Sequence, residues 1–107
     1  MNRFLEIKKL SEFKELISQN KLVFVQFTTT MCHPSKMISP YLEKLTINYP
    51  QVQFAKVYID KYAEIASAYD VRTTPNYMFF KQGEKLKDVV GIEHQEIEAA
   101  FANLTSK

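Results

Sequence analysis

The residues with the clearest capacity for chemistry are Cys32 and two polar residues that follow it, His33 and Ser35. Cys32 is the only cysteine of the 107-residue chain, and it comes soon after an apolar stretch that is typical of a buried strand. Pro34 favours a helix that starts here, because proline is tolerated in the first helical turn. Free backbone N–H groups and the dipole at a helix start stabilise a thiolate. We therefore expect Cys32 to be a nucleophile rather than a core residue.

The expected pKa of Cys32 indicates how reactive this thiol would be. A free thiol has a pKa of about 8.5, and a helix start lowers it by roughly one unit. A hydrogen bond from Ser35 and a charge on His33 would lower it further. The thiolate would attack a disulfide and form a mixed disulfide. A second thiol at position 35 would attack that mixed disulfide at an effective concentration of about 10⁵ M. The hydroxyl of Ser35 hardly ionises, so it cannot attack the mixed disulfide in this way.

The elements that must position these residues alternate along the chain. Strands are predicted at 4–7, 22–27, 52–59 and 77–80, and a last strand follows the turn at 82–83 and ends near Val90. Helices are predicted after Ser11 and Asp60, which would cap them, from about Cys32, and over 93–104. The order βαβαβαββα implies an α/β fold with a mixed sheet and helices on both faces. The length fits one domain, residues 1–107.

Apolar residues at helical spacing mark the face that each helix would bury. They are Phe13, Leu16 and Ile17 in the first helix; Met37, Ile38, Tyr41, Leu42 and Leu45 in the second; Ile65, Ala66 and Tyr69 in the third; and Ile97, Ala100, Phe101 and Leu104 in the last. Pro40 is expected to kink the second helix. The run at 22–27 is apolar almost throughout, which suits a strand buried on both faces.

Composition narrows the function classes. A net charge of +2, with lysines interleaved among acids, gives no reason to expect nucleic-acid binding. No apolar run reaches the ~18 residues of a membrane span, and charged residues interrupt the first ten positions. One cysteine excludes an internal disulfide framework and a multi-cysteine zinc site, and we expect no metal or cofactor. A reduced, cytoplasmic setting is the default expectation.

Several segments resemble the thioredoxin family. They are the strand at 23–27 with Met31-Cys32-His33-Pro34-Ser35-Lys36-Met37-Ile38-Ser39-Pro40, then Arg72-Thr73-Thr74-Pro75, then Phe80-Lys81-Gln82-Gly83-Glu84. Their order and spacing extend the resemblance over essentially the whole chain. The resemblance implies the thioredoxin fold and a thiol–disulfide oxidoreductase that acts on protein disulfides.

The resemblance also implies roles for single positions. Cys32 matches the attacking cysteine, and Ser35 takes the place of the resolving cysteine. Pro75 matches a proline that is cis in this family. The surface that would hold an extended substrate segment comprises Met31, Thr74, Pro75, Val90 and Gly91.

Departures from the family pattern gather around the same thiol. Gln26 replaces a buried acid that moves protons in dithiol enzymes, and His33 replaces a small glycine. Thr28 and Met31 replace tryptophans. Lys56 matches a lysine buried near the active site. The positions expected to tune the pKa of the thiol are Gln26, His33, Pro34 and Lys56. An equally good interpretation of Gln26 and Lys56 is a polar pair that only satisfies hydrogen bonds inside the fold.

Three functions remain open. The first is a monothiol oxidoreductase, in which Cys32 attacks and glutathione, another thiol or a thioredoxin reductase completes the reaction; Ser35 is then either natural or an introduced substitution that traps the complex. The second is a module that binds a partner around Cys32 without turnover. The third is an iron–sulfur carrier similar to monothiol glutaredoxins, ranked last because the downstream Gly-Gly pair is lacking. We expect a monomer that can form dimers linked through Cys32.

Overall fold

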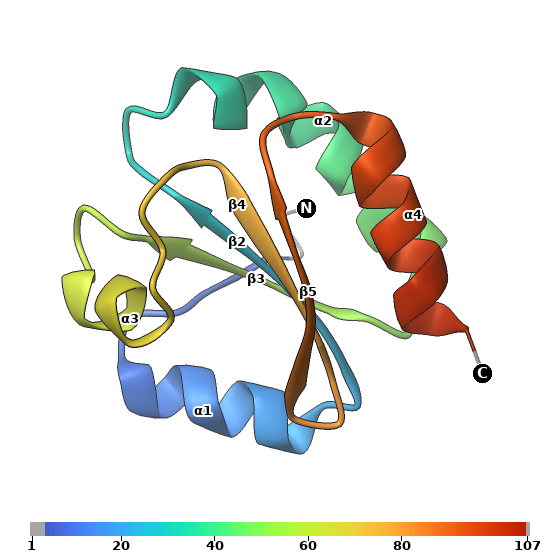
Figure 1. The fold of residues 1–107 in the computed structure, drawn as a ribbon, viewed down its shortest axis with the longest axis horizontal. Helices are drawn as coiled ribbons and strands as arrows, with labels where there is room; N and C mark the ends of the chain where they lie inside the picture. Colours follow the sequence, from blue (N-terminus) through green and yellow to red (C-terminus); the bar gives the residue numbers. More distant parts are fainter. Residues whose placement is uncertain (1–3, 107) are drawn as a thin grey trace.

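The computed structural model describes residues 4–106, and its elements follow the predicted order βαβαβαββα (Figure 1). They are β1 (Leu5–Glu6), α1 (Leu10–Gln19), β2 (Leu22–Thr28), α2 (His33–Asn48), β3 (Gln53–Tyr58), α3 (Ala63–Ala68), β4 (Asn76–Lys81), β5 (Glu84–Val90) and α4 (His94–Thr105). The extent of the expected domain, 1–107, stays a prediction, since residues 1–3 and 107 lie outside the described part.

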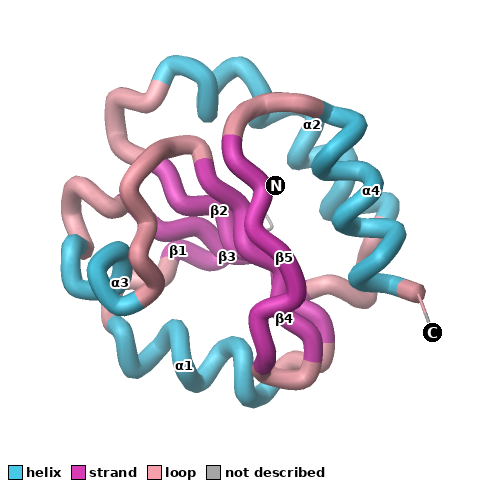
Figure 2. Tube along the Cα trace, viewed as in Figure 1, coloured by secondary structure: helices cyan, strands magenta, loops and turns pink. Residues whose placement is uncertain are grey.

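The strands form one mixed sheet in the order β1-β3-β2-β4-β5. β1, β3 and β2 are parallel, whereas β4 runs antiparallel to β2 and β5 antiparallel to β4. α1 and α3 cover one face of the sheet, and α2 and α4 cover the other (Figure 2). The predicted α/β architecture, with helices on both faces of a mixed sheet, is confirmed.

The central strand, β2, sends its side chains alternately into two cores. Phe24 packs in the core beneath α2 and α4, and Val25 and Phe27 pack in the core beneath α1 and α3. All three are fully buried, as the apolar run predicts. Because strand side chains alternate, Gln26 and Thr28 share the face of Phe24. The sheet therefore presents two polar side chains to α2.

The core beneath α2 and α4 fixes where α2 begins. Ile38, Leu42 and Leu45 of α2 are buried in it, together with Phe101 of α4. The Phe101 ring lies 5.0 Å from the Phe24 ring, centroid to centroid. Each fully buried apolar side chain of this kind stabilises the fold by about 1.5–3 kcal/mol. This packing holds α2 across the sheet, with its first turn beyond the end of β2.

One residue assigned to the buried face of α2 is exposed. The Met37 side chain is 68% exposed, so its predicted place in the apolar face is wrong. Successive helical residues are rotated by about 100°, which carries Met37 outside the face centred on Ile38 and Leu42. α2 continues through Pro40 as one helix, and the expected kink there stays a prediction.

The predicted caps of two helices are wrong. α1 begins before Ser11, because the Glu12 carboxylate accepts hydrogen bonds from the amides of Lys8 and Lys9, at 3.2 and 3.1 Å. α3 begins at Ala63, beyond the reach of Asp60. The Asp60 carboxylate instead accepts hydrogen bonds from the amide and the hydroxyl of Thr30. These hydrogen bonds hold Thr30, in the loop between β2 and α2 that contains Cys32, against Asp60.

Candidate active site

Cys32 lies at the junction of β2 and α2. It is the N-cap residue of α2, and its carbonyl accepts a hydrogen bond from the Lys36 amide at 3.2 Å. Pro34 occupies the first turn, where a missing N–H breaks no helical hydrogen bond. The Cys32 side chain is only 7% exposed. The thiol therefore lies just beneath the surface at the positive end of a helix dipole, which favours its anion.

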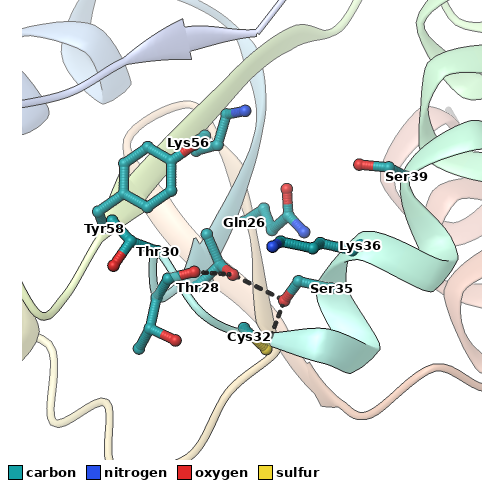
Figure 3. Close-up of a pocket in the computed structure, with 10 residues that line it drawn as sticks. Gln26, Thr28, Thr30, Cys32, Ser35, Lys36, Ser39, Lys56 and Tyr58 are labelled. Carbon is teal, nitrogen blue, oxygen red and sulfur yellow. Dashed lines mark hydrogen bonds between the residues drawn. The ribbon is translucent and has the colours of Figure 1, made fainter.

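A chain of hydroxyl groups ends on the sulfur of Cys32 (Figure 3). Thr28 Oγ1 donates a hydrogen bond to Ser35 Oγ at 2.7 Å, and Ser35 Oγ donates to Cys32 Sγ at 2.8 Å. Both hydroxyl-bearing residues are buried. A hydrogen bond to a thiolate is charge-assisted, and each donor in a chain polarises the next. The arrangement orients Ser35 as a donor to an ionised sulfur.

Burial and hydrogen bonding act on the pKa of Cys32 in opposite directions. Burial raises the pKa, whereas hydrogen bonds from Ser35, Thr74 and Thr28 lower it, and together they leave the pKa of Cys32 below its ordinary value. This direction agrees with the expectation from the sequence. His33 is exposed in the first turn of α2, and its tuning role, like that of Pro34, stays a prediction.

The loop before β4 lies against the thiol. The Thr74–Pro75 peptide bond is cis, as the resemblance implies, and the Thr74 side chain lies close enough to the Cys32 thiol to lower its pKa. The Gly91 amide donates to the Pro75 carbonyl at 3.0 Å, which joins the residue after β5 to this loop. Gly91 has a φ of 101°, a conformation that glycine adopts readily. Three residues of the expected substrate surface therefore come together beside the sulfur.

The other two residues of that expected surface are apolar and exposed. The Met31 side chain is 82% exposed directly before Cys32, and Val90 is 52% exposed at the end of β5. Their role in holding a substrate segment stays a prediction.

The expected tuning residues Gln26 and Lys56 occupy neighbouring strands. They are register partners in the parallel pairing of β2 with β3, and both line a pocket beside Cys32. Gln26 is buried, but Lys56 is only half-buried, so the expectation of a buried lysine is wrong. The Lys56 ammonium lies 5.8 Å and 5.6 Å from the ring centroids of Phe4 and Tyr58, and cation–π attraction draws it toward the edge of the sheet.

Two features near the thiol were not predicted as functional. Thr28 heads the hydroxyl chain, and the alternation of β2, which places it on the face of Phe24, was the signal that could have shown this. Tyr77 is fully buried, and its hydroxyl has no hydrogen-bond partner among the described residues. Burial and then the nearby charge of Cys32 raise the pKa of Tyr77, so its phenol stays neutral.

The sequence of this chain is similar to those of known proteins over most of its length. The family model described as Thioredoxin matches residues 5–103. The chain belongs to the thioredoxin family. Thioredoxin-1 of Schizosaccharomyces pombe is 38% identical in a match that covers 92% of this chain and 97% of that protein. Thioredoxin-1 of Saccharomyces cerevisiae is 39% identical, with 91% and 94% covered.

A solved structure of a thioredoxin has the same fold. Mitochondrial thioredoxin 3 from Saccharomyces cerevisiae, in its oxidised form, matches with a TM-score of 0.91 and 32% sequence identity, over 94% of this chain and 95% of that chain. The thioredoxin fold is therefore confirmed. Thioredoxins are thiol–disulfide oxidoreductases that act on protein disulfides, and this chain is a member of that class with one cysteine.

No helix within residues 4–106 is long and apolar enough to cross a membrane. In the same part of the chain, no group of three or more His, Cys, Asp or Glu side chains is placed to hold a metal ion.

Proposed function

We propose that this chain is a monothiol thiol–disulfide oxidoreductase in which Cys32 is the nucleophile and Ser35 stands in for the resolving cysteine. The observation that carries the proposal is the 2.8 Å hydrogen bond from Ser35 Oγ to Cys32 Sγ. A hydroxyl in that position stabilises the thiolate before the reaction. It supplies no second sulfur after the reaction, because its oxygen hardly ionises.

The proposed step conserves atoms and electrons. The Cys32 thiolate attacks one sulfur of a disulfide, a new S–S bond forms, and the other sulfur leaves with the electron pair as a thiolate. Cys32 then loses its negative charge, so the hydrogen bond from Ser35 loses its charge-assisted strength. The mixed disulfide persists until an external thiolate attacks it, and the two electrons for turnover come from outside the chain.

The substrate side of the proposal uses the surface beside the cis proline. An extended protein segment with a disulfide lies across Met31, Thr74, Pro75, Val90 and Gly91, which brings its sulfur to Cys32. Glutathione or the thiols of a thioredoxin reductase then complete the reaction. The same chemistry holds whether Ser35 is the natural residue or an introduced substitution, because either way the chain carries one sulfur nucleophile.

The pH dependence of adduct formation tests the proposal. The protein is mixed with a small neutral disulfide between pH 5 and 10, and the adduct is followed by intact mass. We expect a stable adduct whose rate of formation titrates with a pKa below the ordinary ~8.5 of a thiol. Cys32→Ser is the control and should give no adduct. A rate that titrates near 8.5, with sluggish formation, would overturn the enzyme proposal.

A binding module is the second candidate, favoured by the exposure of Met31 and Val90. In this case an apolar partner segment lies on the same surface, and Cys32 does no chemistry. Affinity for a disulfide-containing protein, measured with native chain and with Cys32→Ser, separates the candidates. Equal affinity and no covalent complex with the native chain would favour the binding module.

A further inference from the structure

A pocket of about 90 Å³ opens beside Cys32, on the side where Ser35 lies (Figure 3). A single water molecule needs about 10–15 Å³ of such volume, so this space accommodates several waters or one small polar group. Its walls include hydroxyl groups of β2 and α2 and the side chains of Gln26, Lys36 and Lys56. The pocket is therefore polar, and it is continuous with the sulfur.

The charges of this pocket favour an anion. Among residues 4–106 no carboxylate lines it, and neither Lys36 nor Lys56 forms an ion pair within that range. Asp60 is outside this lining, and its carboxylate accepts hydrogen bonds from the amide and the hydroxyl of Thr30. In Figure 3 the Lys36 side chain extends toward Gln26 above the Ser35 hydroxyl, whereas the Lys56 ammonium is turned away from Cys32. Lys36 is thus the cation best placed to meet a ligand.

The amide of Gln26 adds an unused hydrogen-bonding group. Gln26 is only 4% exposed and lines the pocket, yet its side chain makes no hydrogen bond to any other described residue. Its amide therefore keeps its hydrogen-bonding capacity for water or a ligand in the pocket. The Lys36 ammonium and the Gln26 amide could therefore bind a ligand that carries a carboxylate next to a polar group.

The position of the pocket also suits attack on Cys32. In thiol–disulfide exchange the incoming sulfur approaches opposite the leaving sulfur. Thr74 lies at the thiol on the expected substrate side, and Ser35 donates to Sγ from the pocket side. A nucleophile that comes from the pocket therefore reaches Sγ from the direction that Ser35 now occupies.

We propose that this pocket binds the carboxylate of a low-molecular-weight thiol and so positions that thiol to resolve the Cys32 mixed disulfide. The inference rests on the proposed function. The bound thiolate attacks Cys32 Sγ, and the substrate sulfur leaves as a thiolate that takes a proton from water. A second molecule of the thiol attacks the first one's sulfur, releases Cys32 as a thiolate and departs as the disulfide. Two thiols thus supply the two electrons.

The mixed disulfide is also the state in which an anionic thiol binds best. The free Cys32 thiolate repels a carboxylate, whereas the sulfur of a mixed disulfide carries no charge. Binding is therefore expected to strengthen after the substrate has been captured, when a resolving thiol is needed.

The test starts from a preformed mixed disulfide of Cys32 with 4-thiopyridine, whose release is followed by absorbance. The probes are N-acetylcysteine, which carries a carboxylate, and its neutral amide, with rates expressed per thiolate. Lys36→Gln should slow release by N-acetylcysteine about threefold and leave release by the amide unchanged, and high salt should remove the difference. Gln26→Leu should act in the same direction. Lys44→Gln, an exposed position on the same helix outside the pocket, should change neither rate.

Each outcome has a separate meaning. A normal adduct that N-acetylcysteine and its amide release alike in every variant would overturn the pocket proposal and leave the proposed function standing. An effect of Lys44→Gln as large as that of Lys36→Gln would show only general charge attraction and would also overturn it. A chain that forms no adduct would overturn the proposed function and this inference together.

Discussion

The two sides of Cys32 differ in chemistry. On one side lie buried hydroxyl groups, Thr28 and Ser35, whose hydrogen bonds at 2.7 and 2.8 Å converge on the sulfur. On the other side are the cis peptide bond before Pro75 and two exposed apolar side chains of the expected substrate surface, Met31 at 82% and Val90 at 52%. The polar side stabilises a charge at the thiol, and the apolar side offers a surface to an extended chain. Separate substitutions should therefore separate ionisation from substrate binding.

The largest expected effect comes from removing the atom that both sides share. Cys32→Ser should abolish adduct formation with small and protein disulfides alike, because a hydroxyl is hardly ionised at neutral pH. Intact mass after incubation with each disulfide measures this. Residual adduct in Cys32→Ser would show that the reactive group is another residue and would contradict a shared role of Cys32.

The polar side is tested by Ser35→Ala, which removes the donor to Cys32. A hydrogen bond to a charged group is worth about 1.5–3 kcal/mol, so the pKa of Cys32 should rise when this donor is removed. At a pH below both pKa values, the rate with a small disulfide should fall about three- to tenfold, because the higher nucleophilicity of the more basic thiolate offsets part of the loss of ionised thiol. Absorbance of the thiolate across pH measures the shift, and an unchanged pKa would show that Ser35 does not stabilise the anion.

The apolar side is tested by Met31→Ala, with Met37→Ala as the matched control. Both methionines are exposed, at 82% and 68%, but Met37 lies on α2 outside the expected substrate surface. Partial loss of a methionine contact of about 1 kcal/mol corresponds to a fivefold slower reaction with a protein disulfide. The rate with a small disulfide should not change. Equal slowing by both substitutions would contradict the proposed surface.

The smallest effect concerns Tyr77, whose buried hydroxyl lies beneath the polar side without a partner among the described residues. Tyr77→Phe should raise the free energy of unfolding by about 1 kcal/mol, because it removes a buried polar group that makes no hydrogen bond. Tyr41→Phe is the control, since Tyr41 donates to the Glu98 carboxylate at 2.6 Å and should lose stability or stay unchanged. Urea unfolding measures both. A large loss in Tyr77→Phe would show that the hydroxyl has a partner.

Features that depend on hydrophobic pattern could be predicted from the sequence. The run at Leu22–Thr28 indicated a central strand, and the spacing of Ile97, Ala100, Phe101 and Leu104 indicated the buried face of α4. The location of Cys32 at a helix start followed from the strand before it and Pro34 after it. Such features are fixed by burial and by local backbone rules, both of which a sequence displays directly.

Features that depend on which groups meet across the fold could not be predicted. Asp60 looked like a helix cap, but its carboxylate binds Thr30, a contact between two loops that are distant in sequence. Lys56 is half-buried, and its ammonium lies near the rings of Phe4 and Tyr58. Thr28 joins the site because the first turn of α2 brings Ser35 within hydrogen-bond distance of it. Local preference carries no information about these partners.

The most direct test of the account is the lifetime of the Cys32 mixed disulfide in the present chain and in Ser35→Cys, at one concentration of external thiol. Ser39→Cys, a residue one turn further along α2, controls for a thiol that is merely nearby. Effective concentrations of about 10⁵ M predict release in Ser35→Cys that is faster by several orders of magnitude, with little change in Ser39→Cys. Equal lifetimes in the present chain and Ser35→Cys would contradict the claim that Ser35 stands in for a resolving cysteine.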